Sequence, residues 1–452
     1  MYRKNAWAKY QNNMGEVMDF AEQYKKFISF GKTERLVTKE SVELLEKAGY
    51  KNAETLNSVK PGDKLYFVNK NKNVCAFIVG NKPLTEGLRI LGAHIDSPRL
   101  DLKESPLYEK NGFALADTHY YGGVKKYQYV TIPLALHGVI CKKDGTVVEV
   151  HIGEKEDDPV VGITDLLIHL SADQMAKPMS KAIEGENLDV SLGSIPLEEK
   201  DAKAYILNLL KEQYGVEEED FISAEIEIVP AGPARDYGLD RSMVAGYGHD
   251  DRVCAYTSLR ALLDTNEVEH TACCILVDKE EIGSVGATGA HSLFFENAIA
   301  KLAELLGMKE PLYQARLALQ ASKMLSSDVS AGFDPLYPSV NDSKNAAYFG
   351  QGLVFNKYTG SRGKSGSNDA NPEYYAFIRR TMDEADVNWQ SSELGRVDQG
   401  GGGTIAYILG NYNMNVIDAG IAVLNMHAPM EIVSKVDVYE AYRGYKAFLL
   451  AK

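Results

Sequence analysis

The chain has 452 residues, of which 45% are hydrophobic and 25% charged, and its formal net charge is −14 at pH 7. This length supports more than one domain with a large buried core, and the composition is ordinary for a globular protein. The negative charge argues against nonspecific binding to nucleic acid or to an anionic membrane, because phosphate groups require basic surfaces.

The first region, from residue 1 to about 103, combines amphipathic helical patterns with a strand over residues 88–91 that leads to His94. Imidazole is a common metal ligand, and its second ring nitrogen needs an orienting acceptor. Asp96 can supply that carboxylate, because alternate residues of an extended chain point to the same side. Alone, the pair is weak evidence, since a buried structural histidine is the commoner case.

The character of the chain changes between residues 104 and 235. Residues 139–150 are typical of a β-hairpin with an Asp-Gly turn, and residues 200–214 have the apolar spacing of a helix that stops at Gly215. None of the candidate metal ligands falls in this block. We therefore expect a discontinuous catalytic domain, residues 1–103 and 236–452, with an inserted β-rich domain at 104–235.

Ligand candidates resume at Asp250 and Asp251, which follow a glycine-flanked turn and precede a helix that extends to about Asp264. Either carboxylate could bridge two cations with one oxygen for each. The plainer explanation is an acidic helix amino terminus, where carboxylates are favoured by the helix dipole. Position alone leaves both open.

Glu280 and Glu281 follow residues 273–277, a short apolar run that predicts a buried strand. The strand would deliver both carboxylates to the carboxyl edge of a sheet, where open α/β folds place their ligands. Gly283 allows the turn that brings the pair to one site. One glutamate could then bind a metal while the other handles a proton, although an isolated Glu-Glu is more often a solvated loop.

Two further candidates, Asp328 and His427, also follow apolar segments. Together with the preceding positions they provide two histidines, one bridging carboxylate, two terminal carboxylates and a spare glutamate. A two-metal hydrolytic site, with cations about 3.5–4 Å apart, needs this set of residues. The glycine run 400–403 predicts close approach of the backbone to a ligand, with a flexible turn as the alternative.

Apolar runs and cysteines in the sequence indicate the cellular compartment of the protein. No uncharged apolar run reaches the roughly 20 residues that span a bilayer, and the first residues lack the apolar core of a secretory signal. Five cysteines, an odd number without a Cys-x-x-Cys motif, predict reduced thiols and a cytoplasmic protein.

In their order, these motifs resemble the family of dizinc exopeptidases that includes the aspartyl aminopeptidases and vacuolar aminopeptidase I. The resemblance covers essentially the whole chain and rests on the following segments: His94-Ile-Asp96-Ser-Pro, Asp250 before a helix, Asp278-Lys-Glu280-Glu281-Ile-Gly-Ser, Ser327-Asp328, Gly402-Gly403-Thr404-Ile405 and Met426-His427. It implies a mixed-sheet α/β zinc exopeptidase domain with helices on both faces and an inserted dimerisation domain.

The resemblance also implies roles. His94 and Asp328 would bind one zinc ion, Glu281 and His427 the other, and Asp250 would bridge them. Glu280 would be the general base, Asp96 would orient His94, and Gly402 and Gly403 would contact substrate. Asp251 departs from the family pattern, which has asparagine at this position in the aspartyl aminopeptidases; we favour Asp250 as the bridge. Manganese or cobalt would also suit these ligands.

Assembly and substrate follow from the same resemblance. The inserted domain would form dimers that build a dodecamer, and His169, on an apolar stripe, would enter the partner's active site; a packed histidine is the plainer explanation. The expected function is removal of amino-terminal residues, acidic or neutral, from peptides. An acidic side chain would need a cationic pocket, for which Lys357, Arg362 and Lys364 are candidates, or else a solvated loop. A dizinc deacylase or carboxypeptidase and a non-catalytic assembly or cargo scaffold are the alternatives.

Overall fold

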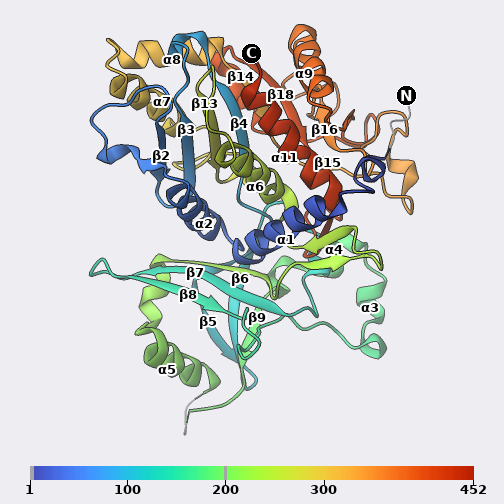
Figure 1. Ribbon diagram of the computed structural model, residues 1–452. Helices are drawn as coiled ribbons and strands as arrows, with labels where there is room; N and C mark the ends of the chain where they lie inside the picture. The colour runs from blue at the N-terminus through green and yellow to red at the C-terminus, as the bar shows by residue number, and fades with distance from the viewer. Residues whose placement is uncertain (1–4, 198–200) are drawn as a thin grey trace. The chain divides into compact units, whose positions relative to one another are not determined.

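The computed structural model describes residues 5–197 and 201–452, which form an α/β protein with three sheets (Figure 1). The chain divides into two compact units. The larger unit comprises the residues up to Asp96 together with 234–426 and 431–452, and the smaller unit comprises 97–233 and 427–430. The sequence had placed the boundaries at 104 and 235. Among the described residues, no helix is both long and apolar enough to cross a membrane.

A nine-stranded mixed sheet organises the larger unit. In spatial order its strands are β1 (Lys51–Asn52), β2 (Lys64–Asn69), β3 (Asn73–Ile78), β13 (Ala272–Val277), β4 (Arg89–His94), β14 (Lys323–Ser326), β18 (Asn415–Gly420), β16 (Leu353–Asn356) and β17 (Trp389–Ser391). The central strands β13, β4, β14 and β18 run parallel. Their carboxyl ends therefore meet at one edge of the sheet.

Both faces of this sheet are covered because its central strands are apolar on both sides. In β3, Ala76 packs into one hydrophobic core and its neighbour Phe77 into the other. The first core includes residues of α1 (Met14–Phe30), α2 (Glu34–Lys47), α6 (His249–Leu263), α9 (Pro372–Glu384) and α11 (Lys435–Leu450). The second includes residues of α7 (Phe294–Leu305), α8 (Pro311–Ala321) and α10 (Ala406–Leu409). The predicted mixed sheet with helices on both faces is confirmed.

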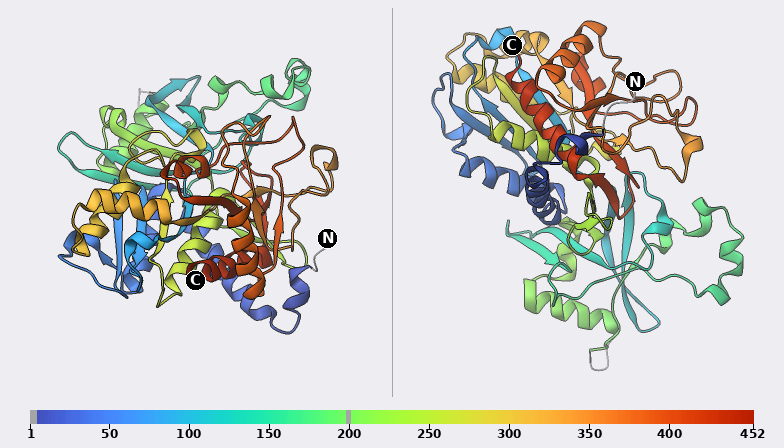
Figure 2. Two further views of the ribbon diagram at one scale, coloured as in Figure 1. Left: turned by 90° about the horizontal axis from the view of Figure 1, so that it is seen from above. Right: turned by 45° about the vertical axis from the view of Figure 1, so that its right-hand side comes forward.

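The helices follow from amphipathic sequences. In α1, Val17, Phe20, Tyr24 and Phe27 recur at helical spacing, and all four are buried. Both views in Figure 2 show α11, in red, alongside α6. A second, five-stranded sheet in this unit has the order β11 (Arg235–Tyr237), β12 (Met243–Gly246), β20 (Glu431–Ser434), β19 (Ala422–Leu424) and β15 (Ser330–Ala331).

The smaller unit is built on a six-stranded antiparallel sheet. Its strand order is β8 (Val147–Ile152), β7 (Leu134–Cys141), β10 (Ala224–Pro230), β5 (Arg99–Lys110), β6 (Phe113–Tyr121) and β9 (Val190–Gly193), and its helices are α3 (Ala172–Met175), α4 (Met179–Ala182) and α5 (Ala202–Tyr214). The predicted hairpin is β7–β8. The predicted helix is α5, which Gly215 ends with φ +64°; Lys200 lies outside the described residues.

Candidate metal centre

The parallel strands bring the predicted ligands of the larger unit to one edge. His94 is the last residue of β4, which lies between β13 and β14 in the sheet. Glu280 and Glu281 follow β13 in a single 3-10 turn, η8 (Glu280–Ile282), and Asp328 lies two residues beyond β14. Neighbouring parallel strands end together, so segments far apart in the sequence converge here.

His94 is buried and held between two carboxylates. Its Nδ1 lies 3.3 Å from Oδ1 of Asp96 and 3.1 Å from the Asp96 carbonyl oxygen, and its Nε2 lies 3.1 Å from Oδ1 of Asp250. Burial by itself would lower the pKa of His94, but the hydrogen bonds with Asp250 and Asp96 raise it well above its ordinary value. Asp96 is therefore placed to orient the imidazole through Nδ1, and Asp250 lies beside Nε2, the nitrogen that would bind a metal.

Asp96 also fixes the Glu280–Glu281 turn. Its Oδ1 accepts the backbone N–H of Glu280 at 3.1 Å, and its Oδ2 accepts that of Glu281 at 3.2 Å. Lys279 adopts φ +68° immediately before the turn, which brings two successive glutamates to the end of one strand. One buried carboxylate therefore positions both the histidine and the glutamate pair.

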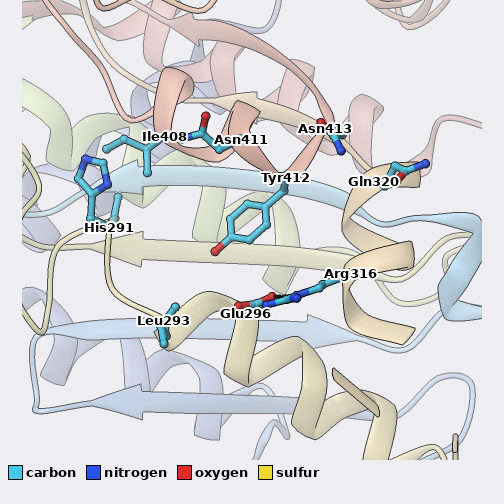
Figure 3. A pocket seen from close by; sticks show the side chains of 10 residues that line it. His291, Leu293, Glu296, Arg316, Gln320, Ile408, Asn411, Tyr412 and Asn413 are labelled. Atoms are coloured by element: carbon cyan, nitrogen blue, oxygen red, sulfur yellow. Dashed lines mark hydrogen bonds and ion pairs between the residues drawn. The ribbon is translucent and has the colours of Figure 1, made fainter. Parts of the chain in front are cut away.

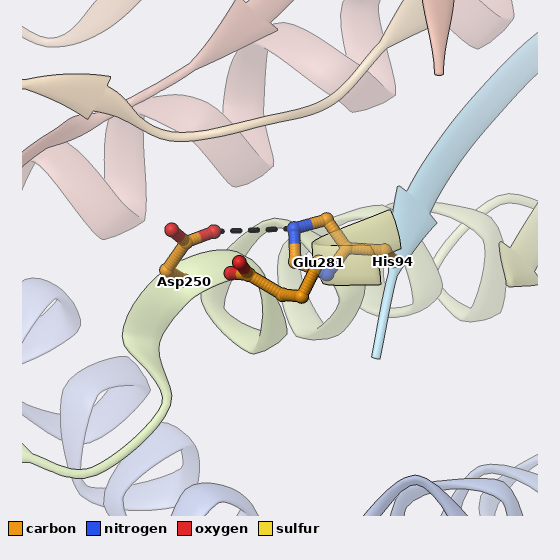
Figure 4. A group of neighbouring side chains, drawn as sticks. All are labelled: His94, Asp250 and Glu281. Atoms are coloured by element: carbon orange, nitrogen blue, oxygen red, sulfur yellow. Dashed lines mark hydrogen bonds and ion pairs between the residues drawn. The ribbon is translucent and has the colours of Figure 1, made fainter. Parts of the chain in front are cut away.

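The side chains form three groups whose possible ligand atoms lie within 4.8 Å of one another: His94, Asp250 and Glu281 (Figure 4); His94, Glu280 and Asp328; and Asp250, Asp251 and Asp328. Burial raises the pKa of Asp328 well above its ordinary value, and the negative charges of Asp250 and Glu280 raise it further. Carboxylates crowded in this way repel one another unless cations neutralise them. The donor set of imidazole and carboxylate suits zinc.

Asp250 and Asp251 sit at the start of α6 with non-helical backbone angles, and the peptide bond between them is cis. The backbone N–H of Asp250 donates to Oε2 of Glu431 at 3.0 Å. Asp251 is fully buried, and burial raises its pKa well above the ordinary value. Both carboxylates therefore stand close to Asp328, so the structure leaves either of them in reach of a cation.

His427 is placed in the smaller unit, where its Nδ1 lies 3.0 Å from the carbonyl oxygen of Gly123. It has φ +67° and follows β19 by three residues. Among the described residues, the groups of possible ligands do not include it. Its predicted role as a zinc ligand stays a prediction.

Sequence reasoning missed Asp418, which lies within β18 and is buried. Its Oδ1 accepts the hydroxyl of Thr404 at 2.6 Å. Burial raises the pKa of Asp418 to about 7, and the charge of Glu280 contributes to the rise. An ionisable residue inside an apolar strand was the available signal, because such a group needs a specific partner when it is buried.

The glycine run 400–403 packs closely against other backbone segments. A Cβ at Gly400 would lie 1.8 Å from the carbonyl oxygen of Leu394, and one at Gly401, which has φ +114°, would lie 1.9 Å from that of Gly360. The chain's own backbone therefore requires glycine at these two positions, and the predicted approach of the run to a ligand stays a prediction. A Cβ at Gly402 or Gly403 would have its nearest neighbouring atom 3.8 Å away, so neither position is crowded. The predicted contact of these two glycines with substrate stays a prediction.

The candidate cationic residues lie in the same region. Arg362 and Lys364 line a cavity of about 240 Å³, together with Glu393, Arg396 and Asp398. Both Lys357 and Lys364, however, pair with Asp369, the latter at 2.8 Å. Two of the three cations that were expected to receive an acidic side chain therefore share one carboxylate of the protein.

A second cavity, of about 450 Å³, lies between α7, α8 and the segment after α10 (Figure 3). Arg316 extends into it and pairs with Glu296 at 2.6 Å, while His291 and Tyr412 line other walls. None of the predicted catalytic or metal-binding residues lines this cavity.

His169 lies in the smaller unit within a 3-10 turn, η5 (Ile168–Leu170), and it is exposed. The side chains around it are apolar and also exposed: Leu166, Leu167, Ile168 and Leu170 have exposed fractions of 54–74%. A histidine packed in the core, the plainer explanation from sequence, is therefore wrong for this chain. Large exposed apolar patches are typical of interaction surfaces.

Comparison with known proteins agrees with the fold and the ordered motifs. A family model described as the aminopeptidase I zinc metalloprotease family, M18, matches residues 27–449. A "Probable M18 family aminopeptidase 1" from Clostridium acetobutylicum is 57% identical over 455 residues, covering 99% of this chain and 98% of the relative. These findings make the protein a zinc metalloprotease. Within that class, the chain belongs to the M18 family of aminopeptidases.

Solved structures of the family share the whole fold. A crystal structure of an M18 aminopeptidase from Thermotoga maritima has a TM-score of 0.96 at 44% identity and covers 100% of both chains. Aminopeptidase I from Clostridium acetobutylicum gives a TM-score of 0.93 at 54% identity, with 99% of each chain covered. A structure of the mApe1 dodecamer of Saccharomyces cerevisiae has a TM-score of 0.77 at 20% identity, covering 95% and 96% of the two chains, a likeness of fold alone. The enzyme is thus a metal-dependent aminopeptidase. The family assignment favours this function over the scaffold, deacylase and carboxypeptidase alternatives.

Proposed function

We propose that the enzyme cleaves the amino-terminal peptide bond with two zinc ions and with Glu280 as general base. The observation that carries this proposal is the clustering of His94 with Asp250, Glu281, Glu280 and Asp328 in overlapping groups. A single ion would need only one such group. Overlapping groups that share His94 and Asp250 support two neighbouring ions with a common ligand.

In this proposal His94 and Asp328 hold one ion, Glu281 and His427 hold the other, and Asp250 bridges. A histidine that ligates through one nitrogen normally donates its other N–H to a carboxylate or a carbonyl oxygen. His94 has Asp96 in that role, and His427 has the carbonyl of Gly123. These contacts support Nε2 as the ligand atom in both residues. Manganese or cobalt would fit the same donors, since imidazole and carboxylate do not discriminate strongly.

Zinc, when bound, supplies a Lewis acid that polarises the scissile carbonyl and makes water more acidic. Glu280 then takes the proton from the attacking water and passes it to the leaving amine. Its backbone is anchored by Asp96 while its side chain remains partly exposed. The glutamate can therefore reach substrate without losing its position.

The substrate must offer a free α-amino group, because a neutral amine would coordinate a metal ion of the centre and an acetylated nitrogen would not. Chelation should abolish release of the amino-terminal residue, and added Zn²⁺ should restore it. A matched peptide with an acetylated amino terminus should resist cleavage. Equal cleavage of the free and acetylated peptides would contradict the proposal.

We propose that the enzyme prefers peptides whose first residue has a neutral side chain. The pairing of Lys357 and Lys364 with Asp369 supports this choice, because it engages two of the three candidate cations with a carboxylate of the protein. Among nitroanilides of leucine, methionine, aspartate and glutamate, the neutral pair should give the higher kcat/KM. A higher value for the acidic pair would overturn the preference but not the aminopeptidase mechanism.

We further propose that the exposed apolar segment 166–170 forms a contact between subunits and presents His169 to the partner's active site. The exposure of Leu170, at 74%, supports the contact, and the related mApe1 is a dodecamer. Leu170→Asp should lower the mass of the assembly measured by light scattering. His169→Phe should keep the mass and the zinc content but reduce turnover. A fully active monomer would refute both expectations.

A reducing, cytoplasmic location is part of the proposal. All five cysteines are free thiols, and the Sγ atoms of Cys75 and Cys273 lie 3.7 Å apart without a bond. Thiol labelling of the protein purified without reductant should find all five reactive after unfolding. Recovery of a disulfide would contradict this expectation.

A further inference from the structure

Two histidines of the smaller unit face each other across a strand pair. His137 in β7 and His151 in β8 are directly opposite in the antiparallel register, so their side chains leave the same face of the sheet. Their Nδ1 atoms are 3.2 Å apart, and the ring centroids are 5.4 Å apart. These two distances mean that the Nδ1 edges of the rings point toward each other.

The outer nitrogen of each ring meets a carboxylate. Nε2 of His137 lies 2.9 Å from Oε1 of Glu154, and Nε2 of His151 lies 3.4 Å from Oε2 of Glu149. The other oxygen of Glu154 accepts the backbone N–H of Gly232 at 3.1 Å, which holds this carboxylate in place as an acceptor. Each carboxylate therefore favours a proton on the Nε2 that faces it.

This arrangement determines what the inner nitrogens present. A neutral imidazole with its proton on Nε2 has a lone pair on Nδ1. Two lone pairs 3.2 Å apart repel each other unless a positive charge lies between them. Either a proton or a metal cation can supply that charge.

The geometry fits a metal ion. Two nitrogen ligands bound at about 2.0–2.1 Å in tetrahedral geometry lie about 3.3 Å apart, close to the observed Nδ1–Nδ1 separation. A histidine that binds metal with one nitrogen while the other donates to a carboxylate is the usual arrangement, and both residues have it. His137 is buried whereas the side chain of His151 is 40% exposed, so an ion can enter from solvent.

We propose that His137 and His151 bind a divalent transition-metal cation, with Glu154 and Glu149 as orienting carboxylates. Neither histidine belongs to the catalytic ligand set. Imidazole nitrogen selects ions such as Zn²⁺, Ni²⁺ and Cu²⁺ over Mg²⁺ or Ca²⁺. With two protein ligands, water completes the coordination, and the affinity is lower than that of a centre with three or more.

The test is a Zn²⁺ titration of the full-length protein by equilibrium dialysis, with metal measured per chain. His151→Gln should bind one equivalent less than the parent at saturation, whatever number of ions the catalytic centre holds. His119→Gln is the matched control, because His119 is an exposed histidine of β6 in the same sheet whose Nδ1 contacts the Tyr120 carbonyl. Glu149→Gln should keep the equivalent but raise its Kd about tenfold, as loss of an orienting carboxylate does.

The difference between variants separates this site from the proposed catalytic ions, and aminopeptidase activity should be unchanged in His151→Gln. His151 is partly exposed, so the substitution leaves the core of the unit intact. Equal zinc content in the parent, His151→Gln and His119→Gln would overturn the proposal. In that case the two rings share a proton instead of a metal ion.

Discussion

Asp96→Asn tests whether one carboxylate organises the metal centre. Oδ1 of Asp96 accepts the Glu280 N–H and lies 3.3 Å from Nδ1 of His94, while Oδ2 accepts the Glu281 N–H. Asparagine offers only one oxygen. Whichever way the amide turns, its NH₂ group must face at least one of these donors.

The expected loss follows from that geometry. A hydrogen bond to a charged group contributes about 1.5–3 kcal/mol, and each 1.4 kcal/mol corresponds to a tenfold change in an equilibrium constant. Zinc affinity should therefore fall by about 10–100-fold, the range found for residues that orient metal ligands. At saturating zinc, kcat should remain low because the Glu280 turn is no longer held.

The assay is competition for zinc with a chromogenic chelator, followed by kcat measured at saturating zinc. Asp278→Asn is the matched control. Asp278 is also buried, and its oxygens accept the backbone N–H of Lys279 at 2.8 Å and the hydroxyl of Thr288 at 2.6 Å. An asparagine at position 278 can still accept the N–H of Lys279 with its oxygen, and its NH₂ group can donate to the hydroxyl oxygen of Thr288. Equal zinc affinity in the two variants would refute the reasoning.

Three further predictions follow from other contacts. Glu280→Gln should retain zinc but lower kcat by at least about 10²–10⁴-fold, the contribution of a general base; equal loss of metal in Glu280→Gln and Asp250→Ala would show that Glu280 is a ligand. Thr404→Val removes the hydroxyl that donates to buried Asp418 at 2.6 Å, so it should raise KM by loosening the glycine run while zinc content stays constant, and Thr404→Ser should restore KM; an unchanged KM would contradict this. Burial raises the pKa of Asp437 from 3.8 to about 7, although the N–H groups of Gly350 and Gly352 oppose the rise. The folded protein therefore keeps this proton up to a higher pH than the unfolded chain does. The free energy of unfolding should fall as pH rises from about 4 to about 7. Asp437→Asn should flatten that part of the profile of Tm against pH, and an unchanged slope would refute the assignment.

The sequence by itself determined the family and several of the main elements of this protein. Short apolar runs predicted β13 and the strand that leads to His94, because a strand buried on both faces needs apolar residues on both sides. The hairpin β7–β8 and helix α5 were equally accessible, since an Asp-Gly turn and a helical apolar spacing are local signals. The ordered His, Asp and Glu-Glu motifs indicated the M18 family, which the comparisons then showed.

Only the tertiary structure decided which of these residues share a site and how each is held. The grouping of His94 with Asp250 and Asp328 depends on strand order, in which β4 lies between β13 and β14 although it precedes both in the chain. The double role of Asp96, the contact of Asp418 with Thr404 and the facing pair His137–His151 are likewise long-range or cross-strand contacts. Local patterns do not fix such pairings, because they depend on strand register and on how one segment packs against another. The exposure of His169 has the same origin: an apolar stripe predicts burial, but the folded subunit leaves it at the surface.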